Sequence, residues 1–223
     1  MLFRSIAHYY CEQAELAILD NNLALARRYV AKTLNCDQAS VRGSILLGRI
    51  ESMESRHVQA IQAWKCVEQQ DPLYLGEVAV QIVAAFRSLQ DEAGLYEYFT
   101  GVLQRHADVS VLLALADIVK ARDGVEAAED FVARWLRKQP SVQGLHRLIQ
   151  LNMVDADATT RADLALLSGI IERLMEQQQG YSCLHCGFSG NTLHWLCPAC
   201  QRWNTIKPQL NMIQNPEETK GHV

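Results

Sequence analysis

The sequence predicts a mainly α-helical chain, built as a solenoid of repeated helix pairs that ends in a small metal-binding β module. Two observations carry this prediction. Small residues recur at a fixed interval along most of the chain, and two Cys-x2-Cys pairs lie close together near the C-terminus. The composition allows a packed core, because 49% hydrophobic and 21% charged residues are ordinary values for a globular protein.

The repeat has a period of 34 residues. Five small residues stand at this interval: Ala26, Ala60, Gly94, Ala128 and Ala162. Twelve residues earlier comes a second series with three small members: Ala14, Gly48, Ile82 and Ala116. Four residues after the first series the side chains are all large: Val30, Trp64, Tyr98 and Val132. This is the pattern of the tetratricopeptide repeat, a helix-turn-helix unit of that length. A generic antiparallel helix bundle is the alternative that the joint match disfavours.

Close helix crossings explain the small positions, and the large residue one turn later is expected to fill the space between neighbouring units. The predicted helix pairs are 6–19 with 23–35, 40–53 with 57–70, 74–88 with 91–105, 109–122 with 125–138, and 142–153 with 161–177. The fifth pair matches least well, so the solenoid is expected to end there. We therefore divide the chain into a solenoid of about five helix pairs (1–178), a metal-binding module (179–208) and a flexible tail (209–223).

A solenoid of this kind offers a concave face for binding. Five positions on the first helices of the pairs are candidates to face it: His8, Arg42, Arg49, Phe86 and Lys120. Their mixed character specifies no ligand. We expect each to be an ordinary surface or packing residue, and the sequence identifies no catalytic residue.

The module is defined by Cys183, Cys186, Cys197 and Cys200, two Cys-x2-Cys pairs separated by ten residues. Four thiolates in this spacing suit one tetrahedral metal site. Gly187 is expected to supply a positive φ after the first pair, and Pro198 to stiffen the second. The gap between the pairs is long enough for a short β-hairpin, whose turn we place at 189–191. His185 and His194 are expected not to be ligands. Four aromatic residues are expected to pack around the site as a small core of its own: Tyr181, Phe188, Trp195 and Trp203.

Either zinc or iron suits a site of four sulfurs. A single iron would make a rubredoxin-like centre and would suggest electron transfer. The short gap and Gln201, which stands where a second glycine would be expected, favour a structural site instead. Cys11, Cys36 and Cys66 are expected to be packing residues. The total of seven cysteines is odd, which disfavours a disulfide framework and suits a reducing cytosol.

The net charge of the chain limits the kinds of partner that it can be expected to bind. The net charge is -4 and the pI is about 6.0, which argues against nucleic acid as a partner. A zinc-ribbon nucleic-acid binder with a patch of Arg202, Trp203 and Lys207 is therefore the least favoured interpretation. No apolar run approaches the roughly 18 residues that span a bilayer, and the first residues do not resemble a secretory signal. We expect the chain as written to be soluble and cytoplasmic.

The module together with the repeats resembles one family closely. The pattern is Tyr181-x-Cys183-x2-Cys186-Gly187-Phe188, then Leu193-x-Trp195-x-Cys197-Pro198-x-Cys200-x2-Trp203, then Thr205-Ile206-Lys207-Pro208. It resembles the C-terminal end of lipopolysaccharide assembly protein B, and the helical stretches 6–12 and 115–128 resemble the later repeats of that family. The fold that the resemblance implies is a tetratricopeptide-repeat solenoid with a rubredoxin-like zinc-ribbon module packed on the repeats.

The resemblance implies a non-enzymatic adaptor that regulates lipopolysaccharide synthesis in Gram-negative bacteria. Such an adaptor promotes degradation of the lipid A pathway deacetylase by the membrane-anchored AAA+ protease FtsH, and other lipopolysaccharide-synthesis proteins are further partners to expect. Family members lie on the cytoplasmic side of the inner membrane, held by an N-terminal helix. This chain resembles the C-terminal half of such a protein, so its membrane attachment would depend on an anchor outside this sequence.

Overall fold

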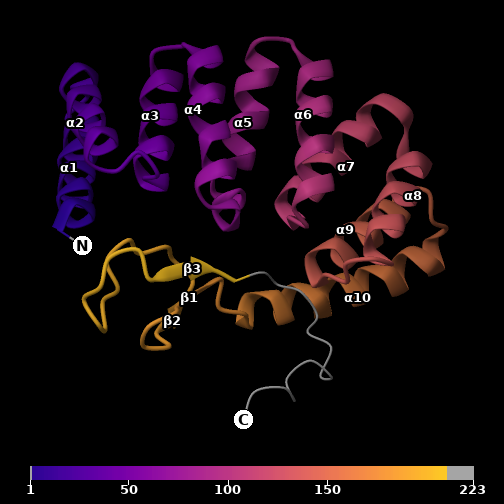
Figure 1. Cartoon of the computed structure of the whole chain (residues 1–223). Coiled ribbons are helices and arrows are strands. Elements are labelled where there is room, and N and C mark those ends of the chain that lie inside the picture. Colours follow the sequence, from indigo (N-terminus) through magenta and orange to yellow (C-terminus); the bar gives the residue numbers. More distant parts are fainter. Residues whose placement is uncertain (1, 210–223) are drawn as a thin grey trace.

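The computed structural model describes residues 2–209, and within them ten α-helices form five antiparallel pairs that stack into an arch (Figure 1). The helices are α1 (Leu2–Leu19), α2 (Leu23–Cys36), α3 (Val41–Met53), α4 (His57–Gln70), α5 (Gly76–Ser88), α6 (Glu92–Arg105), α7 (Val109–Asp123), α8 (Val125–Leu136), α9 (Val142–Asn152) and α10 (Ala158–Gln177). All five predicted helix pairs are confirmed. Apart from Gln209, the tail predicted at 209–223 lies outside the described residues.

Polar caps set the helix boundaries. Side-chain oxygens accept a hydrogen bond from a first-turn amide at six starts: Asn22, Ser40, Asp91, Asp108, Ser141 and Asp157. Each such cap satisfies an amide that has no partner inside the helix. Asp157 holds the amides of Thr159 and Thr160, which starts α10 three residues earlier than predicted. Pro72 opens a short 3-10 helix, η1 (Pro72–Tyr74), so α5 begins at Gly76 rather than at residue 74.

The burial expected at a close helix crossing is present in the first, second and fourth helix pairs. Ala26, Ala60 and Ala128 are completely buried. A Cβ atom on Gly48 would overlap the indole ring of Trp64. Gly48 therefore permits the predicted close crossing of α3 and α4, and the ring of Trp64 fills space inside this pair, whereas the large residue was expected between neighbouring pairs.

The prediction of a close crossing is wrong for two members of the small series. Ala162 is exposed, because α10 is the last helix described in the solenoid and its start crosses no following helix. Gly94 is only half-buried, and a Cβ atom there would first meet the carboxylate of Asp91. Glycine at this point makes room for the cap of α6 rather than for a helix crossing.

The module contains three short strands, β1 (Tyr181–Cys183), β2 (Ser189–Gly190) and β3 (Ile206–Pro208), in the order β2-β1-β3. Both neighbours of β1 run antiparallel to it. The turn predicted at 189–191 is wrong, because Ser189 and Gly190 form β2. The chain reverses at the cysteine pairs instead: β1 and β2 flank the first pair, and a bridge from Leu196 to Trp203 closes the second.

Candidate metal centre

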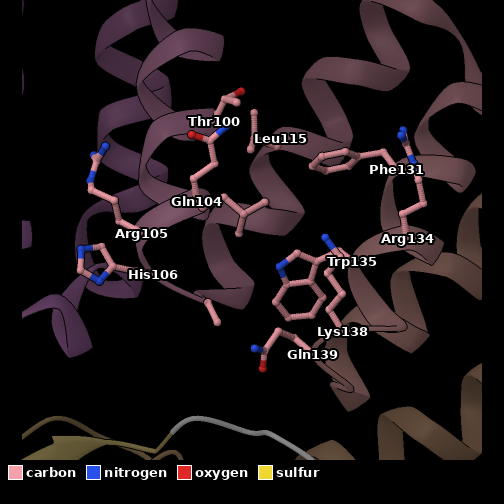
Figure 2. Close-up of a pocket in the computed structure, with 12 residues that line it drawn as sticks. Thr100, Gln104, Arg105, His106, Leu115, Phe131, Arg134, Trp135, Lys138 and Gln139 are labelled. Carbon is pink, nitrogen blue, oxygen red and sulfur yellow. The ribbon is translucent and has the colours of Figure 1, made fainter.

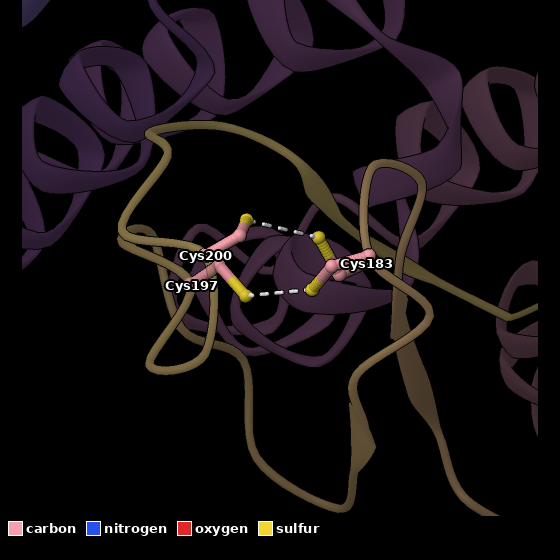
Figure 3. A group of neighbouring side chains, drawn as sticks. Cys183, Cys197 and Cys200 are labelled. Atoms are coloured by element: carbon pink, nitrogen blue, oxygen red, sulfur yellow. Dashed lines mark hydrogen bonds between the residues drawn. The ribbon is translucent and has the colours of Figure 1, made fainter.

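The structure brings the four cysteine sulfurs together (Figure 3). They all lie within 4.8 Å of one another. The Sγ atoms of Cys183 and Cys200 are 3.8 Å apart, and those of Cys186 and Cys197 are 3.7 Å apart. Sulfurs bound to one tetrahedral zinc at about 2.3 Å would be about 3.8 Å apart, so the arrangement fits a single ion. Among the described residues this is the one cluster of metal-ligand side chains that was found.

Each Cys-x2-Cys pair turns in the same way. The amide of Gly187 donates to the carbonyl of Cys183 at 3.0 Å, and the amide of Gln201 donates to that of Cys197 at 3.0 Å. Both residues have a positive φ, 74° at Gly187 and 54° at Gln201. The expected role of Gly187 is confirmed. Gln201 adopts the conformation that favours glycine, which is uncommon for a residue with a Cβ atom.

One sulfur of the cluster has a hydroxyl as a neighbour. Oγ1 of Thr205 lies 3.3 Å from Sγ of Cys183. Hydrogen bonding between this sulfur and Thr205, together with the amides of Cys186 and His185, lowers the pKa of Cys183 to about 6. Metal ligation requires the thiolate form. The sequence pattern alone does not indicate this contact of Thr205. His185 and His194 are exposed and lie outside the sulfur cluster.

The module is docked on the solenoid through its two tryptophans. The ring of Trp203 stacks on His8 of α1, with centroids 4.6 Å apart. The ring of Trp195 stacks on Tyr74 at 5.3 Å, and the guanidinium of Arg42 in α3 lies 5.8 Å from it. The prediction that all four aromatics form a separate small core is therefore wrong for these two, because the repeats supply a larger apolar surface. Tyr181 and Phe188 do pack against the buried centre of the module.

Polar contacts fix the same interface. The hydroxyl of Tyr74 donates to the carbonyl of Ile206 at 2.9 Å. Nζ of Lys207 lies 2.7 Å from the carboxylate of Asp71, and the hydroxyl of Tyr181 donates to Glu77 at 2.6 Å. The repeat therefore already holds Trp203 and Lys207, two of the three residues of the suggested nucleic-acid patch.

The five candidate residues of the first helices have different positions. His8 and Arg42 are buried and contact the module. Burial, and next the charge of Arg42, lowers the pKa of His8 to about 4. The imidazole is therefore neutral where it contacts the module. Phe86 is a core residue, Arg49 is exposed and Lys120 is partly buried.

A separate cavity of about 730 Å³ lies between α6, α7 and α8 (Figure 2). One wall is apolar, with Leu115, Phe131 and Trp135. Arg134 and Lys138 stand on the α8 side of the cavity, and the lining residues in the described chain include no acid. Such a surface can hold an acidic segment that carries a bulky apolar side chain.

Known proteins are similar to this chain in sequence and in fold. A family model described as a rubredoxin metal binding domain matches residues 181–208. Lipopolysaccharide assembly protein B of Escherichia coli K12 is 30% identical over 204 residues, which are 91% of this chain and 52% of that protein. The protein of the same name from Haemophilus influenzae Rd is 30% identical over 214 residues, 94% of this chain and 53% of that protein. A solved structure of PilF from Pseudomonas aeruginosa has a TM-score of 0.49 and 22% identity, covering 77% of this chain and 78% of that one.

The fold and the cysteine cluster define a tetratricopeptide-repeat scaffold with a rubredoxin-like zinc-ribbon module docked on it. The chain is similar to lipopolysaccharide assembly protein B over nearly its whole length, so the resemblance is confirmed. The chain spans about half the length of these curated relatives. Within residues 2–209, none of the helices combines the length and the apolar character that crossing a membrane requires.

Proposed function

We propose that this chain is a non-enzymatic adaptor in the control of lipopolysaccharide synthesis, and that its four cysteines hold one zinc or iron ion. The observation that carries the proposal is the interface between the module and the repeats. Both parts of the pattern that resembles the family, the repeats and the cysteine module, meet at this interface. Side chains from α1, α3, η1 and α5 contact the module at His8, Arg42, Tyr74 and Glu77. The relatives are named as lipopolysaccharide assembly proteins.

The bound ion would have a structural role. Cys183 and Cys186 lie in one tight turn, and Cys197 and Cys200 lie in the other. One ion bound by all four sulfurs would join the two turns. Trp195 and Trp203 flank the second turn, and the bound ion would keep their rings stacked on Tyr74 and His8. A module of this size has little apolar core, and a structural metal can contribute roughly 10 kcal/mol or more to its folding.

The proposed partners are the membrane-anchored protease FtsH and the lipid A pathway deacetylase, on the cytoplasmic face of the inner membrane. The adaptor would bring the deacetylase to the protease and so set its rate of degradation. We place the contact with one partner at the cavity between α6 and α8, because the cations and the apolar wall there suit an acidic segment with an apolar anchor. Other lipopolysaccharide-synthesis proteins would join the same assembly.

The test is the turnover of the deacetylase in the source bacterium. A strain that lacks the gene should degrade the deacetylase more slowly, and the tagged protein should co-purify with both partners. Replacing Arg134 and Lys138 by Glu should impair rescue, whereas Arg137→Glu should not. Arg137 is exposed on the same helix end but does not line the cavity. Unchanged deacetylase half-life in the deletion strain would refute the adaptor.

An iron centre that transfers electrons is the second candidate. It is favoured by the exposure of Cys186, which leaves one edge of the sulfur cluster open to solvent. Purified protein that is red, contains one iron and undergoes reversible reduction would support this function. Colourless protein with one zinc, even from iron-rich medium, would exclude it.

A further inference from the structure

Helix α10 is apolar on two faces, and the repeats cover only one of them. The inner face is formed by Leu164, Ser168, Ile171 and Met175, of which Ser168 is buried and the others are partly buried. Ser168 and Glu172 also contact Nε2 of His146 in α9, at 2.9 and 3.1 Å. These contacts fix which side of α10 is turned toward α9.

The outer face carries four large apolar side chains that remain exposed. The exposed fractions are 63% for Leu166, 48% for Leu167, 42% for Ile170 and 52% for Leu174. Leu166, Ile170 and Leu174 follow at steps of four residues and so form one row on the helix, with Leu167 beside it. Apolar helix faces are normally covered by other parts of a protein. A contiguous exposed apolar patch therefore indicates an interaction surface. Figure 1 shows α10 along the lower border of that end of the arch.

Opposite charges on either side of Leu166 and Ile170 make this part of the face complementary to itself. Asp163 lies one helical step before Leu166 on the same face, and Arg173 lies three residues after Ile170. In two antiparallel helices, the numbers of residues that face each other have a constant sum. A pairing that sets Leu166 against Ile170 of a second copy therefore also sets Asp163 against Arg173 of that copy. A two-fold axis then repeats every contact.

We propose that α10 is the interface of a homodimer, in which two copies pair antiparallel through Leu166, Leu167, Ile170 and Leu174. Asp163 and Arg173 lie on either side of Leu166 and Ile170 and set the register, as flanking charges do in coiled coils. The partner is a second copy of this chain, because Asp163 and Leu166 of one copy face Arg173 and Ile170 of the other when the two helices run antiparallel.

The other charges on the helix disfavour a lipid surface. Asp163, Glu172 and Glu176 outnumber Arg161 and Arg173 between residues 158 and 177. Both arginines also donate to carbonyls of their own chain, Arg161 to Met153 and Ala156 and Arg173 to Gly169. Helices that lie on membranes usually carry an excess of Lys and Arg on the polar face.

The interface is small. A single helix from each copy buries less than the roughly 800 Å² per partner that is usual in a stable complex. We therefore expect a dissociation constant on the order of micromolar. The purified chain should be monomeric when dilute and dimeric when concentrated.

Sedimentation velocity over a concentration series tests the proposal on the purified, metal-loaded protein. The double substitution Leu166→Glu with Ile170→Glu should leave a monomer throughout the series. Leu19→Glu is the matched control, since Leu19 is 76% exposed at the end of α1 and should leave the dimer unchanged. Melting temperatures of both proteins should stay near that of the wild type, because all three side chains are exposed.

A charge exchange tests the register. Asp163→Arg and Arg173→Asp should each weaken the dimer by about tenfold, because each places like charges opposite one another. Combining them restores opposite charges across both ends, so the double variant should regain wild-type affinity. A wild-type protein that stays monomeric at all concentrations would overturn the proposal, as would a double variant that is weaker than either single one. These measurements need neither the protease nor the deacetylase, so they are independent of the proposed adaptor function.

Discussion

Removing the hydroxyl of Tyr74 tests whether the module is held on the solenoid by the contacts described. Tyr74→Phe keeps the ring that stacks on Trp195 at 5.3 Å and deletes the donor to the carbonyl of Ile206 at 2.9 Å. Tyr74 has an exposed fraction of 0% and Ile206 of 1%, so water does not readily replace the lost donor. An unsatisfied buried carbonyl costs about 1–3 kcal/mol.

A cost of about 1–2 kcal/mol would increase the population of undocked module by roughly 5- to 30-fold. The assay is amide hydrogen exchange of β1 and β3, together with the rate at which the zinc-loaded protein gives up metal to a chelator. Both rates should rise. Tyr98→Phe is the control, because its hydroxyl lies 3.4 Å from Glu68 inside the solenoid, away from the module. If Tyr74→Phe exchanges and releases metal at the wild-type rates, the hydrogen bond does not hold the dock.

Three further predictions concern the crossing, the dock and the metal. Gly48→Ala should lower the free energy of unfolding by about 1–3 kcal/mol in urea titrations, since the new Cβ meets Trp64, whereas Gly169→Ala should not destabilise because nothing lies within 4 Å there. Burial lowers the pKa of His8 from 6.5 to about 4, so between these pH values the unfolded chain binds a proton that the folded chain does not. The free energy of unfolding should therefore fall as the pH drops from about 6.5 toward 4, and it should fall less in His8→Phe. An equal fall in His8→Phe would show that His8 does not cause the pH dependence. Cys197→Ser should reduce bound metal well below one ion and shift tryptophan emission to the red, whereas the exposed Cys66→Ser should keep one ion; full metal content in Cys197→Ser would exclude that sulfur as a ligand.

The local pattern was sufficient for the helices and the cysteine cluster. Helix pairs follow from a period that places small residues at several of the crossings, and the crossing of Gly48 with Trp64 is of that kind. The two-residue spacer of each cysteine pair likewise fixes a tight turn whatever surrounds it. These features depend on neighbours that are near in sequence or that recur at a fixed interval, so they can be read from the chain.

The position of the module required the tertiary structure. Ile206 is 132 residues from Tyr74, and Lys207 is 136 residues from Asp71. No periodicity links such pairs, so the sequence indicated aromatic residues around the site but not the surface they face. The same limit explains Ala162, which continues the repeat pattern in sequence although its helix has no later helix to cross among the described residues. The sequence by itself determined the repeats and the four sulfurs, whereas only the three-dimensional packing decided that Trp195 and Trp203 serve the dock.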